Sequence, residues 1–217
     1  MKVHTFTGGA FVQNGYLAVC EDNGQALVVD PGAAASGMVR HLRRTGARPS
    51  AILLTHAHLD HIEGISAVRG AFPEIPIHLH PEDRPLYDGV PDQAAAFGLP
   101  AVDVPPPTDE LTPGGCVRFG EYVLEVRHAP GHSPGHVVLY APADDLAFVG
   151  DVVFAGSIGR TDLPGGDFQV LIESIRRELL TLPPQTRLLP GHGPETTVAH
   201  EARHNPFLVP RYGGELA

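Results

Sequence analysis

Long apolar runs are absent from this sequence of 217 residues. No stretch reaches the roughly 18 apolar residues that a membrane-spanning helix requires, and the N-terminal segment has no charged region followed by a long apolar run. Cysteine is scarce too: Cys20 and Cys116 are too few for a disulfide framework, and we expect both to be packing residues. A soluble, cytoplasmic protein that does not bind a membrane is therefore expected.

Basic residues are few. The chain has 15 Lys and Arg against 25 Asp and Glu, which gives a formal net charge of −10. Proteins that bind nucleic acid usually present a surplus of positive charge, so nucleic acid is not an expected partner. Carboxylates gathered around bound cations would contribute to the same imbalance.

Short β-branched runs alternate with segments of helical periodicity. Strands are predicted at Lys2–Phe6, Tyr16–Cys20, Ala26–Val29, Ala51–Leu54, Ile75–His80, Cys116–Phe119, Tyr122–Arg127, His136–Tyr140, Leu146–Val149 and Arg187–Leu189. Helices are predicted at Ala33–Thr45, Ile62–Gly70, Phe168–Thr181 and Pro194–His204, a tail at Asn205–Ala217, and no strand in the Pro-rich middle, Pro81–Pro113. This order suits an α/β fold with two stacked sheets and helices outside, in one domain over residues 1–217.

The strongest chemical feature is the segment THAHLDH, which follows the strand Ala51–Leu54 directly. It places His56, His58, Asp60 and His61 within six residues. Side chains alternate in an extended segment, so the first three would share one side and a turn at Asp60 would bring His61 to the same pocket. Imidazole and carboxylate donors favour zinc, iron or manganese over calcium or magnesium. A chance cluster of surface histidines is the weaker interpretation.

Three more candidate ligands each follow a strand and a glycine. They are His132 in the turn after Gly131, Asp151 after Gly150, and His192 after Gly191. Side chains in this position can converge at one sheet edge. Each signal is weak alone, but in chain order with the first cluster they indicate one metal centre.

The pattern HxHxDH, then His, Asp and His, resembles the metallo-β-lactamase superfamily over residues 56 to 192. The resemblance implies a four-layer αββα sandwich of two mixed β-sheets with two divalent metal ions at one edge. Zinc is favoured, with iron and manganese as alternatives. The implied ligands are His56, His58 and His132 for one metal, Asp60, His61 and His192 for the other, and Asp151 as the bridge.

Such an arrangement suits hydrolysis. Two cations about 3.5 to 4 Å apart can lower the pKa of a shared water to near neutrality, which supplies a hydroxide nucleophile. They can also polarise a carbonyl and stabilise the oxyanion that forms. Asp60 and Asp151 are the predicted catalytic residues, because Asp60 would orient the hydroxide and Asp151 would hold both ions.

The stretch FAGSIGRTD, residues 154–162, resembles short bacterial glyoxalase II-like hydrolases, in which a basic residue matching Arg160 binds the glutathione part of the substrate. We therefore predict hydrolysis of a small-molecule thioester such as S-lactoylglutathione by the metal-bridging hydroxide, with Arg160 binding substrate. A structural pairing of Arg160 with Asp162 or Asp167 is the alternative. The long helical C-terminal region of full-length glyoxalase II enzymes is missing, so another small thiol is an alternative carrier.

Two other functions stay open. The same stretch resembles persulfide dioxygenases, which hold a single iron by residues matching His56, His132 and Asp151. A metal-binding module without enzymatic activity is the third hypothesis. The sequence also leaves open the metal, the acyl group, and the choice between monomer and homodimer.

Residues around the ligands have predicted supporting roles. Asp30, at the end of the strand Ala26–Val29, is expected to brace the ligand loop by hydrogen bonding rather than to bind metal. His128 and His136 flank the turn of His132 and are candidates for contact with the ligand residues.

Overall fold

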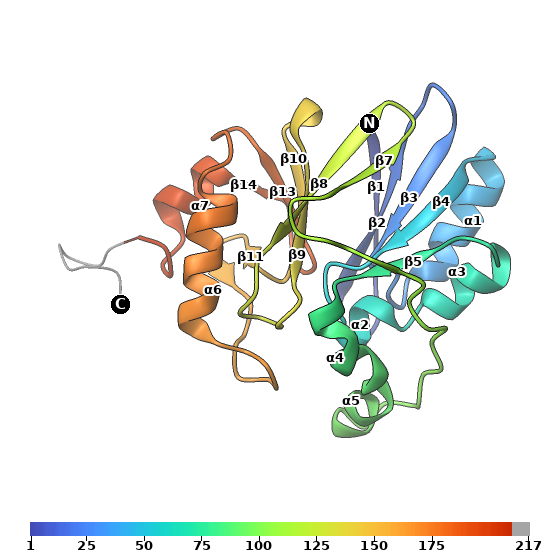
Figure 1. Ribbon diagram of the computed structural model, residues 1–217, viewed down its shortest axis with the longest axis horizontal. Helices are drawn as coiled ribbons and strands as arrows, with labels where there is room; N and C mark the ends of the chain where they lie inside the picture. The colour runs from blue at the N-terminus through green and yellow to red at the C-terminus, as the bar shows by residue number, and fades with distance from the viewer. Residues whose placement is uncertain (210–217) are drawn as a thin grey trace.

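Two six-stranded sheets lie face to face, with helices on both outer sides (Figure 1). The computed structural model describes residues 1–209, so the predicted tail beyond residue 209 lies outside the described residues. The predicted α/β class and four-layer αββα arrangement are confirmed. No helix within residues 1–209 combines the length and apolar character needed to cross a membrane.

The first sheet has the strand order β1-β2-β3-β4-β5-β6. Its strands β1 to β3 pair antiparallel, whereas β3 to β6 pair parallel. The strands are β1 (Lys2–Gly8), β2 (Gln13–Val19), β3 (Gln25–Val29), β4 (Arg48–Leu53), β5 (Ile77–Leu79) and β6 (Asp109–Glu110). Between them lie α1 (Ala35–Thr45), α2 (Leu59–Ile62), α3 (Ile65–Ala71), η1 (Pro81–Asp83), α4 (Arg84–Asp88) and α5 (Val90–Ala96).

The second sheet has the order β14-β13-β10-β9-β8-β7, in which only β10 and β13 pair parallel. Its strands are β7 (Cys116–Phe119), β8 (Tyr122–His128), β9 (Val137–Ala141), β10 (Leu146–Gly150), β13 (Arg187–Pro190) and β14 (Thr196–Thr197). A separate hairpin joins β11 (Val153–Phe154) and β12 (Ser157–Ile158). The helical segments are η2 (Pro142–Asp144), α6 (Phe168–Ser174), its π-helical continuation η3 (Ile175–Leu179), and α7 (Val198–His204).

Alternating side chains on the strands supply three apolar layers. Leu27 and Leu53 point between the two sheets, whereas Val28 and Ile52 point toward α1 and α3. Leu171 of α6 packs on the far face of the second sheet. Because both faces of each sheet are covered, the parallel strands β3 and β4 are apolar over their last three residues, which is the usual pattern for buried parallel strands.

The predicted strands and the four predicted helices are confirmed, with ends that differ by a few residues. The structure adds α4 and α5 within the Pro-rich middle, and the short strands β6, β11, β12 and β14. Proline stands in the first turn of both added helices, where its missing N–H costs no hydrogen bond. Three expectations are wrong. Strand β6 lies in the Pro-rich middle, where no strand is predicted, and β14 occupies the start of the predicted helix Pro194–His204. Cys116 is exposed on the edge strand β7, whereas Cys20 is buried as predicted.

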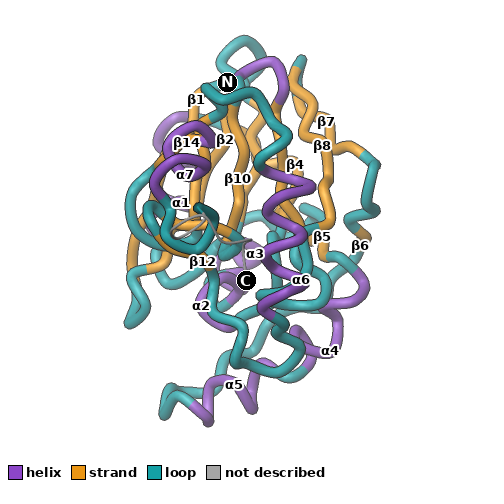
Figure 2. Tube along the Cα trace, turned by 90° about the vertical axis from the view of Figure 1, so that its left-hand side faces the viewer, coloured by secondary structure: helices purple, strands orange, loops and turns teal. Residues whose placement is uncertain are grey.

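Helices α2, α4 and α5 lie together at one end of the strands (Figure 2). The candidate ligands lie at this end, because the loops that carry them follow the carboxyl ends of β4, β8, β10 and β13.

Candidate metal centre

The first ligand loop leaves strand β4 after Leu53 and enters helix α2. His58 is the N-cap of α2, with extended backbone at φ −73° and ψ 148°. Asp60 and His61 therefore lie in a helical turn, so the predicted strand-like alternation ends at His58. The helical turn still brings His61 to the same pocket as His56, because the centroids of their rings lie 4.1 Å apart.

The other three candidates come from loops of the second sheet, after β8, β10 and β13. Glycine is required where these loops approach the centre. A Cβ at Gly191 would lie 2.2 Å from Oδ1 of Asp151 and 2.5 Å from Cε1 of His61. Gly150 has a φ of 47°, a left-handed conformation that turns the chain sharply before Asp151.

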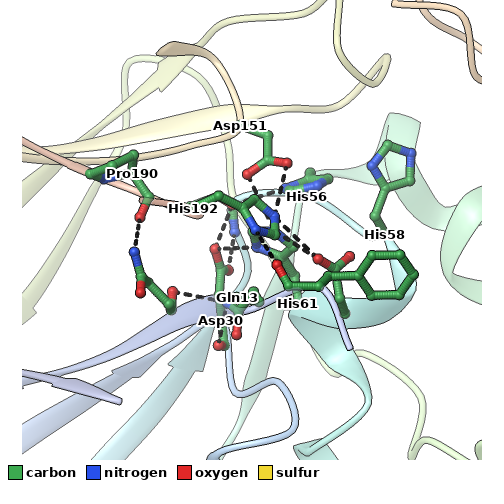
Figure 3. Close-up of polar contacts among 12 residues, drawn as sticks. Gln13, Asp30, His56, His58, His61, Asp151, Pro190 and His192 are labelled. Carbon is green, nitrogen blue, oxygen red and sulfur yellow. Dashed lines mark hydrogen bonds and ion pairs between the residues drawn. The ribbon is translucent and has the colours of Figure 1, made fainter. Parts of the chain in front are cut away.

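The carboxylate of Asp151 points toward the ring of His192 and contacts histidines from three loops (Figure 3). Its Oδ2 is 3.5 Å from Nε2 of His132 and 3.4 Å from Nε2 of His192, and its Oδ1 is 3.3 Å from Nε2 of His61. Two sets of candidate ligands result, each with donor atoms within 4.8 Å of one another. The first set is His56, His58 and His132, and the second set is Asp60, His61 and His192. Asp151 contacts members of both sets.

The outer ring nitrogen of four of these histidines is held by an oxygen. An oxygen acceptor on Nδ1 fixes a proton there, so Nε2 faces the centre and offers its lone pair whenever the ring is neutral. Thr55 Oγ1 already donates to Asp30, so it accepts from His56. The Nδ1 contacts are His56 to Thr55 Oγ1 at 3.1 Å, His61 to Asp30 Oδ2 at 2.9 Å, His132 to the carbonyl of Arg160 at 2.7 Å, and His192 to the carbonyl of Phe11 at 3.0 Å.

Several atoms at the centre lack partners. Among the residues that the structure describes, Nε2 of His56, Nε2 of His61 and Oδ1 of Asp151 are buried without a hydrogen bond. Buried polar atoms are normally paired, and leaving one unpaired costs about 1–3 kcal/mol. Cations between the two sets would satisfy all three atoms. Imidazole and carboxylate donors without thiolate suit zinc, iron or manganese, so the residues present fit a two-metal centre.

The two sets differ in charge in the metal-free chain. Burial and the neighbouring imidazoles hold the pKa of His56 well below its usual value and lower the pKa of His58 to about 3. Burial also acts to lower the pKa of His192, but hydrogen bonds to Asp151 and Asp60 outweigh it and raise this pKa to about 10. The pKa of His61 is raised against burial by the same two carboxylates. His56 and His58 of the first set are therefore neutral, whereas the second set holds imidazolium–carboxylate pairs.

Asp30 braces the second set, as the sequence predicts. Its Oδ1 accepts from the backbone N–H of Thr55 at 2.7 Å, and its Oδ2 accepts from the hydroxyl of Thr55 at 2.6 Å and from His61 at 2.9 Å. Asp30 also lies near His56 and His61 in a geometry that could hold a cation. Because both of its oxygens are engaged by protein donors, we assign it the bracing role.

Asp83 braces the first set, a role that sequence reasoning missed. This buried residue is the last residue of the Pro-containing turn η1. Its carboxylate accepts from the backbone N–H of Ala57 at 2.9 Å, from the hydroxyl of Ser133 at 2.8 Å and from the backbone N–H of Gly135 at 2.6 Å. It therefore ties the loop of His58 to the turn of His132. The available signal was an acidic residue just after a strand end, as at Asp30.

Gln93 of α5 is a second residue that the sequence did not reveal. Its Oε1 accepts from the backbone N–H of Leu59 at 2.9 Å, and its Nε2 donates to the carbonyls of Ala57 at 3.1 Å and Leu86 at 2.8 Å. The side chain clamps α4 and α5 onto the ligand loop. No pattern of periodicity or spacing distinguishes such a residue.

The two histidines that flank His132 differ. His136 contacts the ligands as predicted: its Nε2 accepts from the backbone N–H of Asp151 at 3.0 Å, and its ring stacks on His56 at 4.7 Å between centroids. His128 instead bonds the carbonyl of Pro134 at 2.9 Å and stacks on His80, away from the centre.

A cleft of about 360 Å³ opens over the centre. Its walls are mainly apolar, from Phe11, Phe97, Phe154 and Ile158 among others. Arg160 is the one lysine or arginine that lines it within residues 1–209, and its guanidinium bonds both oxygens of Asp162, at 2.7 and 2.8 Å. The structure therefore places Arg160 at the cleft and also shows the alternative pairing; its substrate role stays a prediction.

The hairpin of β11 and β12 forms one wall of this cleft and is held from behind by α7. Glu201 is fully buried, and its Oε2 accepts from the backbone N–H of Gly156 at 3.0 Å and from Asn205 at 2.7 Å. Asn205 also donates to the carbonyl of Ser157 at 2.9 Å. The C-terminal helix thus fixes the position of a cleft wall.

Comparison with known proteins agrees with this geometry. The family model described as Metallo-beta-lactamase superfamily matches residues 8–192. The hydroxyacylglutathione hydrolase GloC of Haemophilus influenzae is 36% identical over 209 residues, covering 96% of this chain and 98% of GloC.

Solved structures agree as well. The BLEG-1 B3 metallo-beta-lactamase superposes with a TM-score of 0.89 at 39% identity over 96% of this chain and 100% of that one. TTHA1623 in a di-iron-bound form superposes with a TM-score of 0.85 at 44% identity over 94% of this chain and 100% of that one. The matched range includes both ligand sets and Asp151. The chain belongs to the metallo-beta-lactamase superfamily and is a metal-dependent hydrolase with a histidine-rich site.

Proposed function

We propose that the protein hydrolyses a thioester of a small thiol, in the manner of glyoxalase II. One observation carries this proposal: the Asp151 carboxylate contacts His132 on one side and His61 and His192 on the other. That arrangement suits a pair of cations rather than a single one. The relationship to GloC, named a hydroxyacylglutathione hydrolase, supports the thioester class.

In this proposal the first set would hold one cation and the second set the other, and Asp151 would contribute to both. When bound, the two cations would lower the pKa of a shared water and polarise the thioester carbonyl. Asp60 would orient the water, since its carboxylate lines the cleft and its Oδ2 lies 3.2 Å from His192. A thiol with a pKa of about 8.5 leaves without a strong general acid, so the cleft needs none.

The apolar walls have a role in this chemistry. Phe11 and Phe97 pack edge to face, with ring centroids 5.1 Å apart, and both line the cleft. Substrate held among such rings displaces water from the reacting carbonyl, and electrostatic interactions strengthen as water leaves. Arg160, at the same cleft, is the proposed contact for a carboxylate of the thiol part.

The test combines metal analysis with activity on purified protein. We expect two metals per chain and cleavage of S-lactoylglutathione at equal rates with and without oxygen. One iron per chain with oxygen uptake on glutathione persulfide would instead establish a dioxygenase. Faster turnover of a chromogenic cephalosporin than of any thioester would establish a β-lactamase, and bound metal without turnover a binding module.

Two variants control this experiment. His56→Ala removes an inward-facing Nε2 and is expected to lower kcat/KM by roughly a hundredfold or more. His200→Ala removes an exposed histidine of α7 and is expected to change nothing. Full activity of His56→Ala would contradict the proposed site.

A further inference from the structure

A second cavity joins the cleft beside His58. It has a volume of about 380 Å³ and lies between α4, α5 and the loop after Asp162. Four residues line both spaces: His58, Gln93, Phe97 and Leu163. This side cavity therefore continues directly from the candidate metal centre.

The side cavity is built almost wholly from apolar groups. Leu86, Ala96, Phe97, Leu163 and Pro164 form its walls. The amide of Gln93 lies between the side cavity and the ligand loop. It makes three hydrogen bonds, all of them to backbone groups. Within residues 1–209, Asp92, exposed at the start of α5, is the one acidic or basic residue that lines the side cavity besides His58. A polar occupant would find few partners there.

The charges near the cleft also favour an apolar occupant of the side cavity. Arg160 donates two N–H groups to the carboxylate of Asp162, so its positive charge is already paired. Small biological thiols carry carboxylate, ammonium or phosphate groups, which gain little from an uncharged cavity. The acyl side of a thioester is the part that can be wholly apolar.

We propose that the side cavity binds an apolar acyl chain, so that the preferred substrates are thioesters of medium-length acyl groups rather than of the small hydroxyacyl group alone. This inference rests on the proposed thioesterase function and specifies its substrate class. It requires the acyl chain to run from the centre past His58 toward Ala96 and Leu163.

The test is a series of glutathione thioesters that differ only in acyl length: acetyl, butyryl, hexanoyl and octanoyl. A fully buried methylene is worth roughly fourfold in kcat/KM. Because the cavity is partly open, we expect hexanoyl to exceed acetyl by about tenfold or more. A flat or falling series, with acetyl and lactoyl thioesters still cleaved, would overturn the acyl assignment and leave the thioesterase function standing. No cleavage of any thioester would overturn both.

Two neighbouring residues of α5 give a matched pair of variants. Ala96 lines the side cavity and Ala95 does not, although both are exposed on the same helix. Ala96→Asp introduces a charge into the cavity and is expected to abolish the gain of hexanoyl over acetyl. Ala95→Asp adds the same charge to the same helix and should keep the wild-type ratio. An unchanged ratio in Ala96→Asp would overturn the proposal.

A second series distinguishes the two arms of the substrate. Acetyl thioesters of ethanethiol and hexanethiol vary the thiol side alone. We expect kcat/KM to differ little between these two thioesters, and we expect Ala96→Asp to leave that difference unchanged. A gain confined to the thiol series and lost in Ala96→Asp would show that the side cavity holds the thiol arm, which would refute the acyl assignment.

Discussion

The two ligand sets are built alike but carry different charge. Each takes two residues from the loop after β4 and one from the second sheet, and each has its own buried aspartate brace, Asp83 or Asp30. In the first set, His56 and His58 have a lowered pKa and are neutral, whereas carboxylates pair with the histidines of the second set and raise their pKa. The fold thus fixes the positions, and the number of nearby carboxylates decides how strongly protons compete for them.

Removing Asp151, which contacts both sets, should weaken metal binding at both of them. Asp151→Ala deletes the carboxylate that contacts both, so we expect metal content below one per chain and a loss in kcat/KM of roughly a thousandfold or more. Metal quantification and thioester assays measure the two effects. Asp22→Ala, an exposed acid far from the ligand loops in sequence, is the control. Two tightly bound metals in Asp151→Ala would mean that the sets are independent.

Removing one brace should affect one set. Asp83→Asn weakens the support of His58 and His132, and Asp30→Asn weakens that of His61. Each is expected to lower metal affinity about 10–100-fold, the first mainly at the first set and the second mainly at the second. Stepwise titration with a chelator resolves the two affinities. Equal effects of both variants on both sites would show that the braces act on the fold as a whole.

A change of pH should alter the metal affinity of the two sets differently, without any mutation. The pKa of His192 lies at about 10 in the metal-free chain, above its usual 6.5, so its contribution to stability is complete below pH 6.5 and is lost as pH rises toward 10. A cation competes for the same nitrogen, so affinity at the second set should rise by up to about tenfold per pH unit within that window. Affinity at the first set should stay flat there, since His58 titrates near pH 3. Chelator competition across the window tests this, and parallel slopes would contradict the contrast.

A substitution of Arg160, which lies outside both ligand sets, is expected to have the smallest effect on activity. Arg160 is more than half exposed and paired with Asp162, and such surface pairs contribute about 0–1 kcal/mol. Arg160→Gln should therefore raise KM for S-lactoylglutathione by only about fivefold or less, with kcat and metal content unchanged. A large fall in kcat would show that Arg160 acts on the reacting carbonyl.

The fold and the gathering of the seven candidate residues were predictable because their signals are local. Strand, glycine and ligand stand next to one another at Asp151 and His192, and the HxHxDH motif is contiguous. Asp83 and Gln93 were not predicted, since each is a single polar residue whose partners on the ligand loops lie more than twenty residues away. Helices α4 and α5 have 5 and 7 residues, too short for a clear helical period.

The spacing of the donors has a consequence for synthesis on the ribosome. His192 follows His61 by more than a hundred residues, so at roughly 5 to 20 residues per second the first four donors emerge roughly ten seconds before it. The nascent chain then offers three imidazoles and a carboxylate before the second sheet exists. We expect the cation captured at that moment to be retained as the later strands close over it. Cell-free translation with zinc supplied throughout, or only after release, should therefore yield different metal contents, and identical contents would show that loading waits for the finished fold.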